Sequence, residues 1–216
     1  MPSSNFTVCV SGIDGIRYFT EEMSGSYVIT AMRPGENGFY PGGTKCLPIH
    51  DPSAVYGPES TEDTPSEKRG AFEEARAVML SHIPAFVREV VQCVRLGHKR
   101  CLLHCWGGKQ RSAYLALVLL HLVTDWSEEK CARHIRSTVS PHSFTVFSKK
   151  EGGRRELVSA MTFRGVLDLF VNTSEYAECR ETLRATLSAS ASELELTSVQ
   201  NVMDAERASR MNAARW

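Results

Sequence analysis

The chain lacks an excess of charge of either sign. Its 216 residues contain 25 lysines and arginines against 25 aspartates and glutamates, so the formal net charge is zero. A protein without a net field does not attract nucleic acid or an anionic membrane surface through its overall charge. We therefore expect no nucleic-acid partner, and any attraction for anions has to be local.

Long apolar runs and a regular cysteine pattern are also missing. The longest apolar stretch, Ala113 to Val123, is shorter than the roughly twenty residues needed to cross a hydrocarbon core, so we expect a buried helix and no transmembrane segment. Seven cysteines at irregular spacings are unlike a secreted disulfide framework, and the polar start of the chain is unlike a signal peptide. These absences favour a cytoplasmic location, and they leave the oligomeric state undetermined.

The most distinctive stretch of the sequence is a glycine-containing loop before a helix. Cys101 to His104 is typical of a buried strand, and Ser112 to Val123 is typical of a long apolar helix. Backbone N–H groups at a helix start have no partner within the helix, so they can converge on an anion near the positive end of the helix dipole. The glycines allow the backbone to turn inward. The sequence thus predicts a phosphate-binding loop, formed by Trp106, Gly107, Gly108, Lys109, Gln110 and Arg111.

Cys105 lies at the base of this predicted anion site. The loop N–H groups and the planar guanidinium of Arg111 should stabilise its thiolate, so we predict a nucleophile at neutral pH. Attack on a phosphate ester would give a phosphocysteine, which water then hydrolyses. Ser112 can donate a hydrogen bond to the departing sulfur in that second step. The alternative is a buried structural cysteine, the usual state of this residue type.

The pattern His104-Cys105-x-x-Gly108-x-x-Arg111-Ser112 resembles the signature of the cysteine-dependent protein tyrosine phosphatases, in particular the dual-specificity branch. The resemblance extends from about Phe6 to Asn172 and includes two flanking segments, Leu47 to Asp51 and Ser140 to Phe144. It implies that His104 orients the loop and that the second segment packs under the active site. No cofactor is expected for this chemistry.

The leaving group needs a proton and the attacking water needs a base, and one carboxylic acid on a movable loop can serve both. Asp51 ends an apolar strand, where the family places its acid, so it is the expected general acid. It precedes Cys105 by more residues than in compact relatives, because a polar loop over residues 52–70 follows it. Asp63 in that loop is the alternative.

Lys109 gives an indication of the class of substrate. A lysine at this position resembles phosphoinositide-directed phosphatases and some bacterial tyrosine phosphatases, but it can equally be a solvent-facing charge. The expected substrate is a phosphorylated protein, carrying phosphotyrosine and also phosphoserine or phosphothreonine, and a phosphoinositide or inositol phosphate is the alternative. A phosphate-binding adaptor with weak catalysis is a third hypothesis. Sulfur transfer and arsenate reduction are minor alternatives, because those resemblances do not reach the flanking segments.

A metal site is not expected. Cysteines and histidines cluster between Cys93 and Cys105, but alternate strand positions point to opposite faces, so Cys101 and His104 cannot converge on one ion. The same strand geometry keeps Cys101 too far from Cys105 for a disulfide. Cys46 and Cys9 stay open as redox partners of Cys105.

The order of the predicted elements indicates an α/β fold. Strands are predicted over 6–10, 27–31, 44–49 and 101–104, and helices over 14–22, 71–80, 84–96, 112–123, 128–136 and 156–171. We expect a central, mostly parallel sheet of four to five strands with helices on both faces, which the dual-specificity phosphatase resemblance also implies. Residues 1–186 are the predicted phosphatase domain, and 187–216 a Ser/Ala-rich linker and C-terminal helical tail.

Overall fold

The computed structural model of the chain describes residues 4–13, 15, 27–33, 45–59, 66–149 and 155–213. Its centre is a five-stranded sheet in which all neighbouring strands are parallel. The strands are β1 (Ser4–Ser11), β2 (Tyr27–Ala31), β3 (Lys45–Leu47), β4 (Arg100–His104) and β7 (Ser192–Ser198), in the spatial order β3-β2-β4-β1-β7. The predicted α/β fold with a parallel sheet is confirmed.

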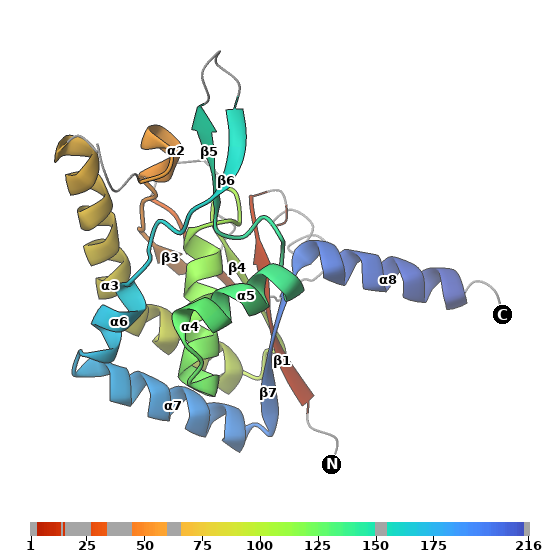
Figure 1. The fold of residues 1–216 in the computed structure, drawn as a ribbon. Helices are drawn as coiled ribbons and strands as arrows, with labels where there is room; N and C mark the ends of the chain where they lie inside the picture. Colours follow the sequence, from red (N-terminus) through yellow and green to blue (C-terminus); the bar gives the residue numbers. More distant parts are fainter. Residues whose placement is uncertain are drawn as a thin grey trace.

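Most of the described helices pack on one face of this sheet, and the start of α8 packs on the other face (Figure 1). Strand residues alternate between the faces, so Val8 and Val10 join the large core while Cys9 lies on the opposite side. On that side Val199, the first residue of α8 (Val199–Ala213), packs with Cys9, and α8 then projects away from the body of the molecule. The large core is built with α3 (Ser66–Arg95), α4 (Arg111–Thr124), α5 (Glu128–Thr138), α6 (Val166–Val171) and α7 (Glu175–Ala189).

α3 is one helix of 30 residues, where the sequence predicts two. Pro84 lies inside it and removes one intrahelical hydrogen bond, but apolar packing along the helix outweighs that loss. By length and composition, α3 is the one helix among the described residues that could cross a membrane. Its buried side chains identify it instead as a core helix; they are Phe72, Ala75, Met79, Ile83, Phe86, Val87, Val90, Val91, Cys93 and Val94.

The C-terminal segment is not the linker and tail that the sequence predicts for 187–216. α7 runs across the predicted boundary, and β7 then pairs with β1 from Ser4 opposite Ser192 to Val10 opposite Ser198. Apolar residues occupy every second position over a short part of this Ser/Ala-rich segment, and two of them, Leu194 and Leu196, pack onto the core. The segment is therefore an integral part of the sheet, and only α8 extends beyond it.

A hairpin replaces the first part of the helix that the sequence predicts over 156–171. β5 (Thr145–Lys149) and β6 (Arg155–Ser159) are antiparallel, with Thr145 opposite Ser159. The hairpin lies at the same end of the molecule as the short helix α2 (Ser53–Tyr56) (Figure 1). Apart from residue 15, the helix predicted over 14–22 lies outside the described residues.

Because Leu196 is only 6% exposed and belongs to the core, we expect Leu196→Ala to lower the free energy of unfolding by about 2–4 kcal/mol. Glu193→Ala, at an exposed position of the same strand, is the matched control and should change it by less than about 0.5 kcal/mol. Urea unfolding of the full chain measures both. Equal stability of the two variants would mean that β7 is a dispensable tail.

Candidate active site

Cys105 lies at the carboxyl end of β4, next to the end of β1. Its N–H donates to the carbonyl of Ser11 at 3.3 Å, which continues the pairing of the two strands by one residue. The side chain is 2% exposed, and its Sγ lies 3.2 Å from the hydroxyl oxygen of Ser112 in the first turn of α4. When the thiol is ionised, Ser112 is the donor in that contact.

Residues 105–110, named the Cys105 loop here, are pressed against the end of β1 at Gly108. Gly108 has φ of +68°, and a Cβ on it would lie 2.6 Å from the Gly12 nitrogen and 2.7 Å from the Ser11 carbonyl carbon. Only glycine fits that position. A Cβ on Gly107 would meet nothing within 4 Å. Of the two glycines that the sequence analysis named, one is therefore required by packing.

The Cys105 loop leaves backbone N–H groups unpaired. The carbonyls of Trp106 and Lys109 accept hydrogen bonds from the N–H groups of Ile13 and Phe144, at 2.9 and 2.7 Å. In contrast, no acceptor among the described residues is recorded for the N–H groups of Trp106, Gly107, Gly108 and Gln110. The N-cap residue of α4 gives no side-chain cap either. Unpaired donors at a helix N-terminus form a site suited to an anion.

Arg111 is the first residue of α4 and is 4% exposed. Its Nη1 donates to the carbonyl of Ile49 at 3.1 Å, which fixes the guanidinium between the Cys105 loop and the segment that leads to Asp51. The side chain lines the same pocket as Cys105. The arrangement holds a permanent positive charge beside the sulfur.

His104 is buried at the last position of β4, and its Nε2 lies 2.6 Å from Thr30 Oγ1. Burial lowers the pKa of His104 to about 4, so the ring is neutral at pH 7. It does not line the pocket, which excludes direct contact with a substrate there. Its contact with β2 suits the orienting role that the sequence analysis gives it.

Asp51 follows β3 and lines the pocket. Its Oδ1 accepts hydrogen bonds from the Ser53 N–H at 3.0 Å, the Ser53 hydroxyl at 2.6 Å and the Thr162 hydroxyl at 3.4 Å. No hydrogen bond to its Oδ2 is recorded among the described residues. One carboxylate oxygen is thus anchored, and the other has no recorded partner in the described part of the chain. Asp63, the alternative acid, lies outside the described residues.

The pocket above Cys105 has a volume of about 1110 Å³. One wall comes from α2 and another from β5, through Thr145, Val146 and Ser148. Neither wall is identified in the sequence analysis. A signal for the hairpin does exist, because a Gly-Gly pair separates two short runs that contain Val, Phe and Leu. The apolar lining includes three exposed side chains, Val55, Tyr56 and Trp106, and two lysines line it, Lys68 and Lys109.

Three other cysteines are buried away from the pocket. Burial raises the pKa values of Cys9 and Cys131 to about 12, and a hydrogen bond with Cys93 together with burial raises that of Cys101. These groups are protonated thiols at neutral pH. None of them lines the pocket. Among the described residues there is also no cluster of three or more His, Cys, Asp or Glu side chains that could hold a metal ion.

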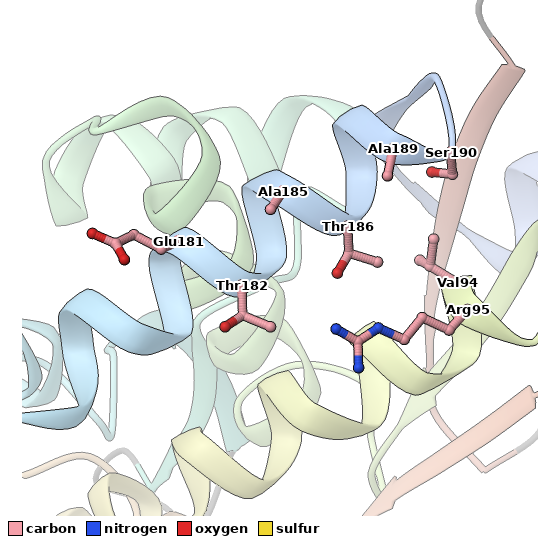
Figure 2. A pocket seen from close by; sticks show the side chains of 8 residues that line it. All are labelled: Val94, Arg95, Glu181, Thr182, Ala185, Thr186, Ala189 and Ser190. Carbon is pink, nitrogen blue, oxygen red and sulfur yellow. The ribbon is translucent and has the colours of Figure 1, made fainter.

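A second hollow, of about 670 Å³, lies between α3 and α7 (Figure 2). It is close to the amino-terminal ends of β4 and β7, whereas Cys105 follows the carboxyl end of β4. Small and hydroxyl side chains dominate its lining, and Arg95 and Glu181 are the charged members. No cysteine or histidine is among the residues that line it, in contrast to the pocket that Cys105 lines.

No family model and no curated protein sequence matches the chain. Several solved structures resemble it in fold. A crystal structure of DUSP15 shares 16% identity at a TM-score of 0.47, covering 86% of this chain and 92% of DUSP15. PTPMT1 in complex with PI(5)P shares 16% at a TM-score of 0.41, covering 84% and 94%. OH1 from the Orf virus, a tyrosine phosphatase, shares 14% at a TM-score of 0.33, covering 83% and 81%.

These solved structures come from the same superfamily of cysteine-based phosphatases that the sequence motif resembles. The similarity concerns the fold. The chemistry assigned below depends on the side chains and backbone groups of this chain.

Gly108→Ala should disrupt the Cys105 loop, because the added Cβ meets backbone atoms that cannot move aside. We expect a loss of stability of about 1–3 kcal/mol and a larger relative loss of oxyanion binding, measured with vanadate or tungstate. Gly107→Ala is the matched control and should keep the stability of the parent protein. If both variants were equally stable, the contact with β1 would not constrain the loop.

Proposed function

We propose that the chain is a phosphomonoester hydrolase that works through a phosphocysteine intermediate. The observation that carries this proposal is the position of the Cys105 sulfur, 3.2 Å from the Ser112 hydroxyl at the base of a loop with unpaired N–H groups. The thiolate attacks phosphorus while the ester P–O bond breaks. The loop N–H groups and Arg111 bind the phosphoryl oxygens, whose charge is spread over the transition state.

Asp51 supplies the proton in this mechanism. The leaving oxygen takes the bonding electron pair and a proton from the free Oδ2 of Asp51, which gives a neutral alcohol or phenol. In the second step the Asp51 carboxylate accepts a proton from water as the water oxygen attacks phosphorus. The P–S bond then breaks, and the hydrogen bond from Ser112 stabilises the departing thiolate.

Phosphorylated protein is the proposed substrate, with phosphotyrosine and also phosphoserine or phosphothreonine as the reacting group. Exposed apolar surface supports this choice. Val55 on α2 is 78% exposed and Trp106 on the Cys105 loop is 52% exposed, and both line the pocket together with Tyr56. Such side chains can pack against a phenyl ring or against neighbouring peptide side chains. A pocket of about 1110 Å³ is also wide enough for shorter phosphoresidues.

A phosphoinositide or inositol phosphate is the second candidate substrate. Lys68 lies at the start of α3 and Lys109 in the Cys105 loop, and both line the pocket. Two ammonium groups in one pocket favour a substrate that carries further phosphate groups. The apolar side chains favour the peptide, so the phosphoinositide stays the alternative.

A cytoplasmic location is part of the proposal. The seven cysteines of the chain are free thiols, and the mechanism needs Cys105 in its reduced form. A reducing compartment keeps such a nucleophile active.

Cys105→Ser should abolish hydrolysis of p-nitrophenyl phosphate, with kcat falling by more than about a thousandfold. Cys46→Ser replaces an exposed cysteine outside the pocket and should keep the parent activity. Rapid acid quench of a single turnover with labelled substrate should trap phosphate on Cys105. Retained activity of Cys105→Ser would contradict the mechanism, and failure of the parent protein to form phosphocysteine would favour the adaptor hypothesis.

Side-by-side assays with phosphopeptides and short-chain phosphoinositides should show a preference for the peptides. Lys109→Ala should then change kcat/KM for phosphopeptides by less than about tenfold, because the loop N–H groups and Arg111 already bind a monophosphate in the proposed mechanism. Lys99→Ala, at an exposed position before β4, is the matched control. A preference for phosphoinositides that Lys109→Ala removes would reverse the order of the two substrates.

A further inference from the structure

The side chain of Gln110 is buried although it belongs to the Cys105 loop. It is 4% exposed, and its amide group is fully engaged. Nε2 donates to the carbonyls of Thr145 at 3.1 Å and Ala160 at 2.8 Å, while Oε1 accepts from the Thr162 N–H at 3.1 Å. A glutamine amide has two N–H donors, and both are used here. The orientation of this side chain is therefore fixed.

All three partners of the Gln110 amide lie at the base of the β5–β6 hairpin. Thr145 is the first residue of β5, and Ala160 and Thr162 follow β6. The neighbouring residue of the loop adds a fourth bond, because the Lys109 carbonyl accepts from the Phe144 N–H at 2.7 Å. The hairpin that forms one wall of the pocket is thus bonded to two consecutive residues of the Cys105 loop.

Thr162 connects the base of the β5–β6 hairpin to Asp51, the proposed general acid. Its N–H donates to Gln110, and its hydroxyl donates to Asp51 Oδ1 at 3.4 Å. Thr162 is 3% exposed, so few other conformations are open to it. A path of two hydrogen bonds therefore runs from the Cys105 loop, where the phosphate would bind, to the carboxylate that would donate the proton.

Helix capping does not account for the amide contacts. Gln110 is the N-cap residue of α4, but its side chain makes no cap hydrogen bond. Among the described residues, the hydrogen bonds of its side-chain amide all go to the hairpin base. A general acid has to stay within hydrogen-bond reach of the leaving oxygen, and a misplacement of about 1 Å can cost on the order of a hundredfold in rate.

We propose that Gln110 is a positioning residue for the acid step. Its backbone belongs to the predicted phosphate-binding loop, and its side chain fixes the hairpin base and, through Thr162, the carboxylate of Asp51. This role rests on the proposed phosphatase function. It predicts that loss of the Gln110 amide harms proton donation more than it harms attack by Cys105.

Two substrates with different leaving groups separate these effects. The phenolate of phenyl phosphate titrates near ~10, like tyrosine, and needs a proton, whereas p-nitrophenolate leaves without one. Gln110→Ala should lower kcat for phenyl phosphate by about tenfold or more and kcat for p-nitrophenyl phosphate by less than about threefold. Asp51→Asn is the reference and should show the same selectivity. Gln92→Ala, on the exposed side of α3, is the control and should show none.

Thr162 gives an independent test of the same path. Thr162→Val keeps the shape and the N–H bond to Gln110 but removes the hydroxyl, so it should lower kcat for phenyl phosphate selectively. Thr162→Ser should restore it. Gln110→Glu retains the size and the Oε1 acceptor but loses both donors, and it replaces Gln110→Ala if that variant does not fold.

The outcomes are distinct. Equal losses on both substrates in the Gln110 and Thr162 variants, with Asp51→Asn still selective, would overturn the positioning role and leave the phosphatase proposal standing. An unselective Asp51→Asn would overturn the assignment of the acid and the positioning role with it. Hydrolysis by Cys105→Ser at the parent rate would instead overturn the proposed function itself.

Discussion

The close approach of Gly108 to the end of β1 is the constraint on which the site depends. Because backbone atoms of Ser11 and Gly12 occupy the space of a Cβ, the Cys105 loop has one way to lie against the sheet. In that position the Trp106 carbonyl accepts a hydrogen bond from the Ile13 N–H, just beyond β1. The Lys109 carbonyl accepts one from the Phe144 N–H at the hairpin base. With these carbonyls engaged, the loop N–H groups are left for an anion. A parallel sheet makes this possible, since the carboxyl ends of its strands meet at one edge.

The electrostatic consequence is a pocket that offers hydrogen-bond donors to an anion. Trp106 and Gly107 are exposed, so water can bind the loop N–H groups in the free protein and an oxyanion can take its place. The surrounding groups add little competing charge. His104 is neutral because burial lowers its pKa, and the buried thiols of Cys9 and Cys131 are protonated because burial raises theirs. Positive charge beside the sulfur comes mainly from Arg111, held by the Ile49 carbonyl.

Features encoded over a few consecutive residues could be predicted from the sequence, and those encoded across the chain could not. The strand before Cys105, the loop and the helix after it follow from local patterns, and so do β1 and β2. β7 could not be recognised because its alternation of apolar and polar residues is short. It becomes a strand by pairing with β1, which lies about 190 residues earlier in the sequence. The anchoring of Asp51 by Thr162 and the contacts of Gln110 with the hairpin likewise join segments that are distant in sequence. The place of Asp51 in the pocket could be predicted, because this residue follows β3 at the edge of the sheet where Cys105 lies.

The hydrogen bonds of Gln110 connect the walls of the pocket to the groups that react in the proposed mechanism. In many enzymes the groups that react lie on a fixed framework, while variable loops select the substrate. Here α2 and β5 form the walls that a substrate would contact, and the reacting groups belong to the ends of β3 and β4. One amide hydrogen-bonds the Cys105 loop to the base of β5, and Thr162 hydrogen-bonds this base to Asp51, whose Oδ1 also accepts two shorter hydrogen bonds from Ser53 on α2. Both walls of the pocket are therefore hydrogen-bonded to the Asp51 carboxylate, so in the proposed mechanism we expect a change at either wall to affect proton donation.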